Sequence, residues 1–320
     1  MTDWRPSSSP AAASRRAELL QRARHHFAGQ NILAVDTPAQ SRSAGTDPNI
    51  DSLAVRPNVG NDYFLHTSPE FCMKRLLADG YPDIYSICHV FRDGESGGRH
   101  IPEFTMAEWY RLGFDLPAII KDTLQFIAAC LDEPELTESA IQFDYAEAFQ
   151  RFANIDVYEA SADELVRGYS DDERLKSVMA EDRQAQLDLI LSTVIAPQFA
   201  RNQLTVVRHY PAAQGALARL CPADKRVADR FEVFCGDLEL ANGYVELSDV
   251  EEQRQRFDQD LELRQQTGRP LRPLDHQLLA ALDSGLPDCA GVAVGIERLQ
   301  MVLDKTDDIS DVVTFTAETS

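Results

Sequence analysis

Two β-rich runs, DIYSICHVFRD and EFTMAEWYRLG, lie close together between residues 83 and 113. Their enrichment in β-branched and aromatic residues is typical of strands, and the glycine-rich segment between them predicts a hairpin with a long loop. A hairpin of this length requires a sheet with antiparallel neighbours. This feature therefore limits the fold more than any other in the chain.

The remaining patterns alternate between helices and strands without βαβ units. Helices are predicted at 14–29, where Ser14 is a candidate N-cap, and at 68–80. Strand character is found at 31–38 and 63–67, and it returns near the C-terminus in the runs LTVVRHYP, RFEVFCGDLELANGYVEL and DCAGVAVGI. Together these patterns predict an α+β fold in which helices flank an antiparallel sheet.

The sequence also predicts a simple domain organisation. Residues 1–13 are expected to form a flexible tail, and residues 14–320 a single domain, because the candidate site residues described below extend from Ser68 to Arg298. Within this domain, the helical and acidic stretch at about 116–201 is interpreted as an insertion.

Charge and composition exclude several classes of protein. The 320-residue chain has 52 acidic and 31 basic residues and a net charge of −21, which disfavours broad nucleic-acid binding but leaves room for a local positive pocket. No run approaches the roughly 18 to 20 apolar residues of a membrane span, and the N-terminus lacks the apolar core of a signal peptide, so we expect a cytoplasmic protein. The six cysteines form no CxxC pair, which argues against a zinc ribbon and a disulfide framework and favours reduced thiols.

The hairpin loop FRDGESGGRHIPEFT gathers cationic groups in this acidic chain. Arg92 offers a planar donor fork for an α-phosphate, and Arg99 and His100 are placed to hold outer phosphates. Phe104, on the return strand, is a candidate for stacking on a purine base. The loop thus indicates a nucleoside triphosphate site, and the alternative is a solvated hairpin tip with surface arginines.

A second group of candidate residues lies in DLELANGYVEL. If Asn242 and Gly243 form a two-residue turn, Glu239 lies opposite Glu246. If the strand continues instead, the two carboxylates lie on opposite faces unless a bulge intervenes. Facing carboxylates would favour a cation, and Mg²⁺ bridging a triphosphate is the natural one, whereas the alternative is a pair of solvated glutamates.

A third segment, GVAVGIERLQMVL, leads from a strand of small residues into a helix. Glycines allow a ligand to approach the backbone closely, and Arg298 is placed to bind a terminal phosphate. The segment lacks the GxGxxG and GK[ST] patterns, so by itself it is weak evidence.

Taken together, these segments and one near the N-terminus resemble motifs of the class II aminoacyl-tRNA synthetase catalytic domain. FRDGE…RHIPEFT resembles motif 2, GVAVGIER resembles motif 3, and RARHHFAGQNILAVDTP resembles motif 1, with Pro38 as its terminal proline. SPEFCMKRLL, RHIPEFTMAEWY and ELANGYVELSD resemble segments of lysyl-tRNA synthetases in particular. The expected absence of an anticodon-binding barrel, and Ala293 at a motif 3 position that is typically glycine, are similar to the EpmA (PoxA, GenX) family of elongation factor P (R)-β-lysine ligases.

The resemblance implies an activity. Members of this family activate (R)-β-lysine with ATP and transfer it to the ε-amine of a lysine on elongation factor P, so ATP and Mg²⁺ are the expected cofactors. The expected partners are elongation factor P and (R)-β-lysine, with no membrane and no tRNA anticodon contact. Motif 1 implies a homodimer.

The resemblance also implies roles for particular residues. Arg92 and Arg298 would be catalytic, and Glu239 and Glu246 would hold the metal. The amino acid would be bound by Ser68, Glu70, Tyr110, Glu246 and Ala293, and ATP by Arg92, Arg99, His100, Phe104, Glu239, Leu240, Gly295 and Arg298.

Two positions depart from the family pattern. Gly94 stands where the family has glutamate, with Glu95 directly after it, and Ile101 replaces an asparagine that contacts the nucleotide. Because both changes remove polar contacts, they put nucleotide affinity in question. They make credible a non-catalytic paralogue that acts as a binding module. The other alternative is an adenylate-forming enzyme like lysyl-tRNA synthetase.

The chemistry expected from the resemblance needs no side-chain nucleophile. The sequence shows no persuasive Ser/His/Asp or Cys/His arrangement, which agrees with this expectation. The other six histidines are expected to be surface or packed residues: His25, His26, His66, His89, His209 and His276.

Overall fold

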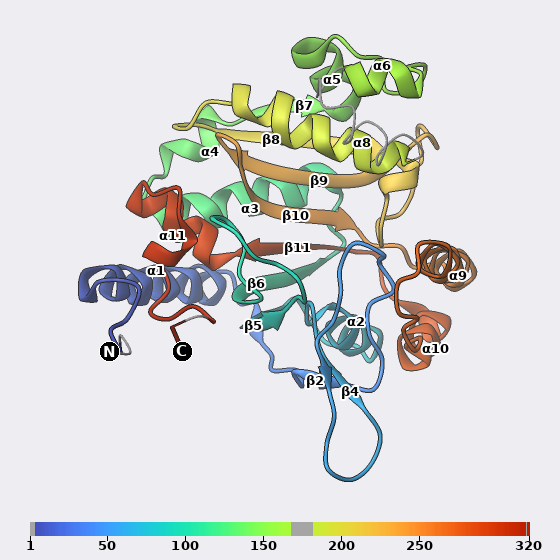
Figure 1. The fold of residues 1–320 in the computed structure, drawn as a ribbon, viewed down its shortest axis with the longest axis horizontal. Coiled ribbons are helices and arrows are strands. Elements are labelled where there is room, and N and C mark those ends of the chain that lie inside the picture. The colour runs from blue at the N-terminus through green and yellow to red at the C-terminus, as the bar shows by residue number, and fades with distance from the viewer. Residues whose placement is uncertain (1–3, 168–181, 318) are drawn as a thin grey trace.

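A mixed eight-stranded sheet forms the centre of the protein (Figure 1). The computed structural model describes residues 4–167, 182–317 and 319–320. Along the sheet the strand order is β1-β5-β6-β11-β10-β9-β8-β7. The strands of this sheet are β1 Leu33–Ala34, β5 Ile84–Phe91, β6 Glu103–Leu112, β7 Ile141–Asp144, β8 Leu204–Pro211, β9 Val227–Cys235, β10 Leu238–Val245 and β11 Cys289–Gly295. The neighbours from β5 to β8 pair antiparallel, and the outer strands β1 and β7 pair parallel. The predicted hairpin is confirmed as β5 and β6, and the predicted α+β class is confirmed.

Helices cover the sheet in separate groups. Figure 1 shows α2, α9 and α10 gathered at one end of the central strands and α1 and α11 at the other. The helices of the structure are α1 Pro10–Gly29, α2 Glu70–Ala78, α3 Leu116–Leu131, α4 Glu135–Ser139, α5 Tyr145–Ala153, α6 Ala162–Arg167, α8 Arg183–Ile190, α9 Val250–Gln266, α10 His276–Gly285 and α11 Ile296–Asp304. A separate three-stranded sheet has the order β2-β4-β3, with β2 Gln40–Ser41, β3 Ala54–Val55 and β4 Tyr63–Leu65. None of the helices in the described ranges combines the length and apolar character needed to cross a membrane.

Helix α1 begins earlier than the sequence indicated. Ser9 is the N-cap, and its side chain accepts a hydrogen bond from the amide of Ala12, so the predicted cap at Ser14 is wrong. Proline is favoured in the first helical turn, and Pro10 is the first residue of this helix. Residues 10–13 of the predicted tail therefore belong to α1.

The segment predicted as an insertion contributes to the central layers. Helix α3 contacts α1 and the strand β10, and β7 extends the main sheet beside β8. Residues 168–181 of this segment lie outside the described ranges. The division of the chain into a tail, one domain and an insertion stays a prediction.

The main core lies between one face of the sheet and helices α1, α3 and α11. Phe27 stacks on Phe126, and both rings pack against Trp109 of β6. Side chains alternate along a strand, so Ala107 and Trp109 enter this core while Glu108 and Tyr110 point to the other face. That second face forms the floor of the cavity described next.

Candidate active site

A cavity of about 760 Å³ lies on the face of the sheet opposite α1, α3 and α11. Its floor comes from β6, β10 and β11, and its walls come from α2, α9 and several loops. Every residue that the sequence singled out as a site residue lines this cavity: Ser68, Glu70, Arg92, Arg99, His100, Phe104, Tyr110, Glu239, Leu240, Glu246, Ala293, Gly295 and Arg298. The structure brings the set together, and the individual roles stay predictions.

A β-bulge in β10 places Glu239 and Glu246 on one face. The strand continues through Asn242 and Gly243, so the two-residue turn is wrong and the alternative with a bulge is correct. Glu239 pairs with Phe234, and Asn242 pairs with Glu232, two residues earlier on β9, because the register shifts between Glu239 and Ala241. The extra residue turns Glu239 to the side that Asn242, Tyr244 and Glu246 occupy.

Cationic groups gather at one end of the cavity. The guanidinium of Arg92 lies 5.1 Å from the centre of the Phe104 ring, and its Nη1 lies 3.6 Å from Glu95 Oε1. On the other side, Arg298 Nη1 donates to the Glu239 carbonyl at 2.9 Å, and its Nη2 lies 2.7 Å from His100 Nε2. Burial and the charge of Arg298 lower the pKa of His100, so at neutral pH the arginines supply the positive charge here.

The departures from the family pattern have structural counterparts in this loop. Gly94 has a φ of 78°, a conformation that favours glycine, and Glu95 reaches toward Arg92 and His100. Ile101 packs against the main core instead of offering a polar group. Arg99 is bound to Asp237, with Nη2 2.7 Å from Oδ2, so a phosphate would have to compete with this carboxylate.

The other end of the cavity is acidic and deeply buried. Lys74 Nζ lies 2.7 Å from Glu70 Oε1 and 2.6 Å from Glu246 Oε2, and all three side chains are almost completely shielded from solvent. Ser68 accepts a hydrogen bond from the amide of Glu70 at the start of α2. Burial raises the pKa of Glu246 to about 8, although the charge of Lys74 opposes this shift, and the charge of Glu70 adds to it.

A further buried carboxyl, Glu108, faces the same end. The Tyr110 hydroxyl donates to Glu108 Oε1 at 2.8 Å. Burial, followed by the charge of Glu70, raises the pKa of Glu108 to about 8. The backbone register places Ala293 of β11 directly between Glu108 and Asn242.

The pocket around these carboxyls depends on Gly291 in β11. A Cβ atom on Gly291 would lie 2.5 Å from Tyr110 Cε1 and 2.6 Å from Glu246 Oε1. Real Cβ contacts are never this short, so the two side chains occupy the space that glycine leaves open.

The acidic end thus contains more carboxyl groups than cations. Glu70 and Glu246 bind the one lysine, Lys74, and Glu108 is a third carboxyl whose raised pKa keeps it protonated at neutral pH. Sequence reasoning missed Glu108 and Lys74. A glutamate on the inward face of a buried strand, and a lysine four residues after Glu70 on one helix face, were the available signals.

Carboxylates also converge near the cationic end. Glu232 of β9 lies on the same face as Glu239, and burial together with the charge of Glu239 raises the pKa of Glu232 to about 7. The Tyr210 hydroxyl donates to Glu232 at 2.6 Å, and Arg230 forms an ion pair with it. For a Mg²⁺ ion, Glu239 is the carboxylate at this end that lines the cavity, with one oxygen 3.4 Å from Arg298 Nη1, whereas Glu246 is bound more closely by Lys74, at 2.6 Å.

Glu297, in the motif-3-like segment, links the motif-2-like segment to helix α1. Its carboxylate accepts hydrogen bonds from the amide of Thr105 in β6, at 3.0 and 3.1 Å, and from Arg16 of α1 at 2.7 Å. Arg16 also donates to the Thr105 hydroxyl. This contact sets the helix that carries Arg298 against the strand that follows the Arg92 loop.

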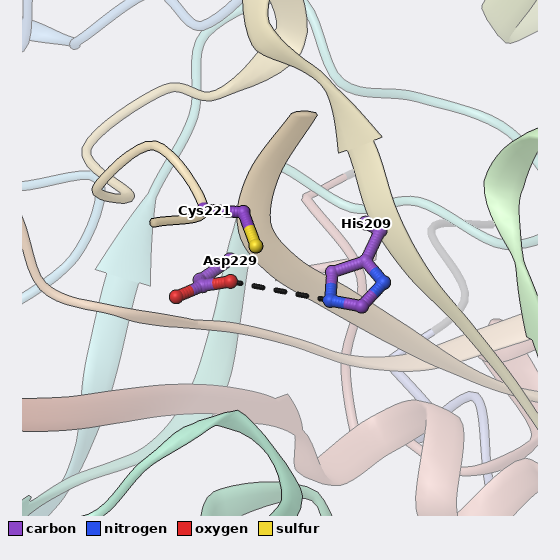
Figure 2. A group of neighbouring side chains, drawn as sticks. All are labelled: His209, Cys221 and Asp229. Atoms are coloured by element: carbon purple, nitrogen blue, oxygen red, sulfur yellow. Dashed lines mark ion pairs between the residues drawn. The ribbon is translucent and has the colours of Figure 1, made fainter. Parts of the chain in front are cut away.

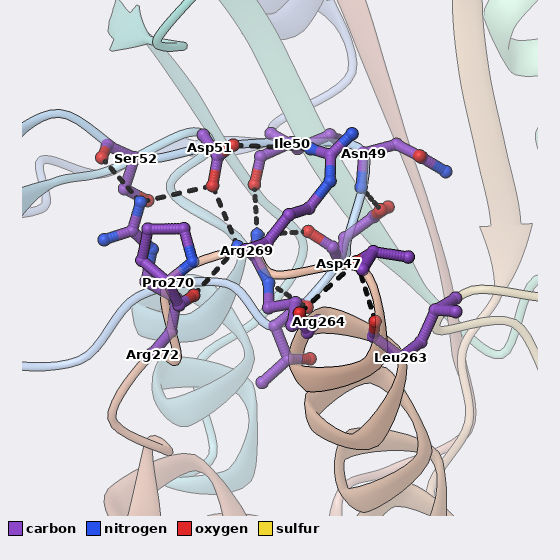
Figure 3. A network of polar contacts seen from close by, with 12 residues as sticks. Asp47, Asn49, Ile50, Asp51, Ser52, Leu263, Arg264, Arg269, Pro270 and Arg272 are labelled. Atoms are coloured by element: carbon purple, nitrogen blue, oxygen red, sulfur yellow. Dashed lines mark hydrogen bonds and ion pairs between the residues drawn. The ribbon is translucent and has the colours of Figure 1, made fainter.

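A wall of the cavity is held by one buried arginine (Figure 3). Arg264 of α9 donates to the carbonyls of Thr46, Asp47 and Ile50, and its Nη1 lies 2.8 Å from Asp51 Oδ1. Although burial raises the pKa of Asp51, hydrogen bonds from Arg264 and Arg272 bring it below the ordinary value. The Asp51 carbonyl in turn accepts from the amide of Asp93, which links this wall to the Arg92 loop.

Comparisons with known proteins agree with the geometry. The family of class II tRNA synthetases (D, K and N) matches residues 1–319. Proteins named elongation factor P–(R)-β-lysine ligase are similar over nearly their whole length. Examples are those of Erwinia tasmaniensis, 40% identical with 98% of each chain covered, Avibacterium paragallinarum, 37% identical with 98% of each covered, and Haemophilus influenzae, 38% identical with 99% of this chain and 98% of the relative covered.

Proposed function

The chain belongs to the class II tRNA synthetase family of the D, K and N type and, within it, to the elongation factor P–(R)-β-lysine ligases, and from this premise we propose that it is an ATP-dependent ligase. It would activate a lysine isomer and join it to a lysine side chain of elongation factor P. The observation that carries this proposal is one cavity with guanidinium groups at one end and an excess of carboxyls at the other.

The acidic end suits an amino acid with two ammonium groups. Glu70, Glu108 and Glu246 outnumber Lys74, and a bound ammonium group would favour the ionised form of Glu108, because buried charges are stable only when they are paired. A β-lysine brings two cations and leaves its carboxylate to point toward the arginines. The carboxyls therefore select the substrate by charge, and Tyr110, Ser68 and Ala293 shape the space around it.

The cationic end would position ATP for adenylation. Phe104 offers its ring to adenine, and Arg92 lies over the same ring, close to where an α-phosphate would stand. A carboxylate oxygen of the amino acid attacks the α-phosphorus, the bond to the β-phosphate oxygen breaks, and pyrophosphate leaves. Arg92 and Arg298 stabilise the negative charge on the phosphate oxygens, so catalysis is largely positioning and charge neutralisation.

The metal site is a proposal of the same kind. Glu239 is the residue that would hold a Mg²⁺ ion, and the ion would supply positive charge that offsets the negative charge of the triphosphate. Glu246 was predicted to serve both the metal and the amino acid. Its ion pair with Lys74 favours the second role.

The second step transfers the acyl group. The ε-amine of the acceptor lysine attacks the carbonyl carbon of the mixed anhydride, an amide bond forms, AMP leaves, and the amine loses a proton. This chemistry uses no nucleophile from the enzyme. We further propose a homodimer built on the motif 1 segment and a cytoplasmic location, where elongation factor P is encountered.

Intact-mass analysis of elongation factor P tests the proposal. The factor is incubated with this protein, ATP, Mg²⁺ and, in separate reactions, (R)-β-lysine, (S)-β-lysine or α-lysine. We expect one added lysyl unit on the factor with a β-lysine, and no addition when ATP is left out. No mass gain with any isomer would overturn the proposed acceptor.

Two parallel measurements separate the rival functions. ATP–pyrophosphate exchange that depends on the amino acid, together with charging of tRNA instead of the factor, would indicate an enzyme like lysyl-tRNA synthetase. The absence of exchange from folded protein with Mg²⁺ present would indicate a binding module.

A further inference from the structure

A histidine, a cysteine and an aspartate meet outside the cavity (Figure 2). His209 lies near the end of β8, Asp229 lies in the first part of β9, and Cys221 lies in the loop between these strands. One ligand atom from each residue lies within 4.8 Å of the others. None of the three lines the cavity, so the proposed ligase chemistry does not account for them.

An irregularity in β8 directs His209 into this group. The pairing of β8 with β9 shifts register between Arg208 and Tyr210, and His209 has a φ of 57°. Residues other than glycine rarely adopt this left-handed conformation, and bulges often turn a side chain toward a functional position. The bulge turns the imidazole toward Asp229 of the neighbouring strand.

The far side of the imidazole is held by a carboxylate. His209 Nδ1 lies 3.0 Å from Asp144 Oδ1, and Arg208 Nε donates to the same oxygen at 2.8 Å. With Nδ1–H donating to Asp144, the lone pair of Nε2 points to Asp229 and Cys221. A carboxylate behind a histidine is the usual arrangement around metal-binding histidines, because it fixes the tautomer and strengthens the ligand.

The near side leaves room for an ion. His209 Nε2 lies 4.0 Å from Asp229 Oδ1, which is too far for a hydrogen bond. The other oxygen of Asp229 accepts from Arg219 Nε at 2.9 Å, which orients the carboxylate. Zinc-bound nitrogen and oxygen atoms lie about 2.0 to 2.2 Å from the ion and, in a tetrahedral site, about 3.4 Å from each other, so the two side chains would approach by roughly half an ångström when they share an ion.

We propose that His209, Cys221 and Asp229 form a Zn²⁺ site, with solvent completing the coordination. Thiolate and imidazole ligands select zinc over the harder Mg²⁺ and Ca²⁺ ions. A neutral imidazole, a thiolate and a carboxylate balance the charge of a divalent ion. The proposal is independent of the ligase activity.

The ion would cross-link parts of the chain that support the cavity. The loop from β8 to β9 contributes Ala212, Gln214 and Leu217 to the cavity wall before it reaches Cys221. A metal bond at Cys221 would fasten the end of this loop to both strands. Zinc is therefore expected to raise the thermal stability of the protein.

Zinc titration tests the site. The full-length protein is freed of metal with a chelator, and Zn²⁺ is added in competition with a chromophoric chelator. We expect one ion per chain, a rise in melting temperature, and, with Co²⁺ in place of Zn²⁺, a near-ultraviolet thiolate-to-cobalt charge-transfer band. The absence of stoichiometric binding in the wild type would overturn the proposal.

Variants locate the ligands. Cys221→Ser and His209→Asn should each weaken zinc binding at least tenfold and remove the rise in melting temperature, and asparagine tolerates the positive φ at position 209. Asp144→Asn should weaken binding about 10- to 100-fold through the orientation of His209. Cys88→Ser, at a half-buried position in β5, is the control and should bind zinc like the wild type. If the folded double variant, with Cys221→Ser and His209→Asn, were freed of metal and then bound zinc with the wild-type affinity, the ion would have to lie elsewhere.

Discussion

The ammonium of Lys74 lies 2.6 Å from the carboxylate of Glu246, and both side chains are almost completely buried. A buried ion pair contributes little net stability, but removing one partner leaves the other charge without compensation in a medium of low dielectric. At this position the loss would be larger than for a simple pair, because Glu70 also binds Lys74. The lysine therefore holds the acidic end of the cavity together before substrate arrives.

Replacing Lys74 with methionine tests this role. We expect Lys74→Met to lower the free energy of unfolding by about 3 to 5 kcal/mol, measured by urea denaturation at neutral pH. The loss should shrink at lower pH, where Glu246 can take up a proton. Lys121→Met, on the exposed side of α3, is the control and should change stability by less than about 0.5 kcal/mol. Equal effects of the two substitutions would show that Lys74 is not a structural ion-pair partner.

The pKa of Glu108 predicts a pH dependence of stability and of binding. Burial and the charge of Glu70 raise this pKa to about 8, so the folded state holds a proton that the unfolded state releases near pH 4.5. The stabilising contribution is complete below the unfolded pKa and is lost as pH rises through about 8. A ligand with two ammonium groups should bind the ionised carboxylate and release the proton.

Calorimetry in buffers of different ionisation enthalpy measures that proton release. Between pH 6 and 8 we expect the affinity for the preferred lysine isomer to rise by at most about tenfold per unit of pH. Glu108→Gln should bind the amino acid more weakly, with a flatter dependence on pH. A wild-type affinity that falls as pH rises would contradict the assignment of the ammonium site.

The fold could be predicted from the sequence where local patterns and pairing agree. The runs that became β5 and β6 showed strand composition on both sides of a glycine-rich loop, and this was enough to predict the hairpin. The start of α1 was misplaced because Ser9 and Ser14 are both acceptable caps, and local composition does not rank them. The bulge at Leu240 could be named as an alternative but not chosen, because a single residue of register depends on tertiary pairing with β9.

The candidate site was predicted where residues follow a motif and was missed where only the folded sheet brings them together. Arg92 and Arg298 belong to recognisable segments, whereas Glu108 becomes part of the site because β6 turns its side chain to the cavity. His209 was expected to be an ordinary surface or packed histidine. Its neighbours Asp144 and Asp229 are distant in sequence, so no spacing pattern could indicate them.

Gly291 sets the width of the amino-acid pocket. Because a Cβ here would overlap Tyr110 and Glu246, we expect Gly291→Ala to raise KM for the amino acid strongly and to lower stability by about 1 to 3 kcal/mol. Amino-acid-dependent pyrophosphate exchange and thermal denaturation measure the two effects. Gly29→Ala, at the end of α1 with no atom within 4 Å of the added methyl, should leave both unchanged or slightly improve stability. A normal KM in Gly291→Ala would place the substrate elsewhere.

Arg264 should link stability to substrate binding through the loop that it holds. Lysine keeps the charge but lacks the planar set of donors that reaches three carbonyls and Asp51, so each lost hydrogen bond costs about 1 to 3 kcal/mol. We expect Arg264→Lys to lower the melting temperature and to raise KM for the amino acid. Arg254→Lys, at an exposed position of the same helix, is the matched control. A destabilised variant with unchanged KM would show that the loop is only a structural element.

Arg298 lies between Glu239 and His100 at the nucleotide end of the cavity. It donates to the Glu239 carbonyl at 2.9 Å and lies 2.7 Å from His100, so its guanidinium is fixed before any phosphate is bound. Fixed donors of this kind stabilise developing charge without reorganisation, and removing one typically costs about 100- to 1,000-fold in rate. We expect Arg298→Gln to lower ATP–pyrophosphate exchange by that factor while the melting temperature changes little. Arg201→Gln, an exposed arginine outside the cavity, should keep the wild-type rate. If Arg298→Gln lost less than about threefold in exchange, the guanidinium would not act on the phosphates, and the assignment of this end of the cavity to ATP would have to be abandoned.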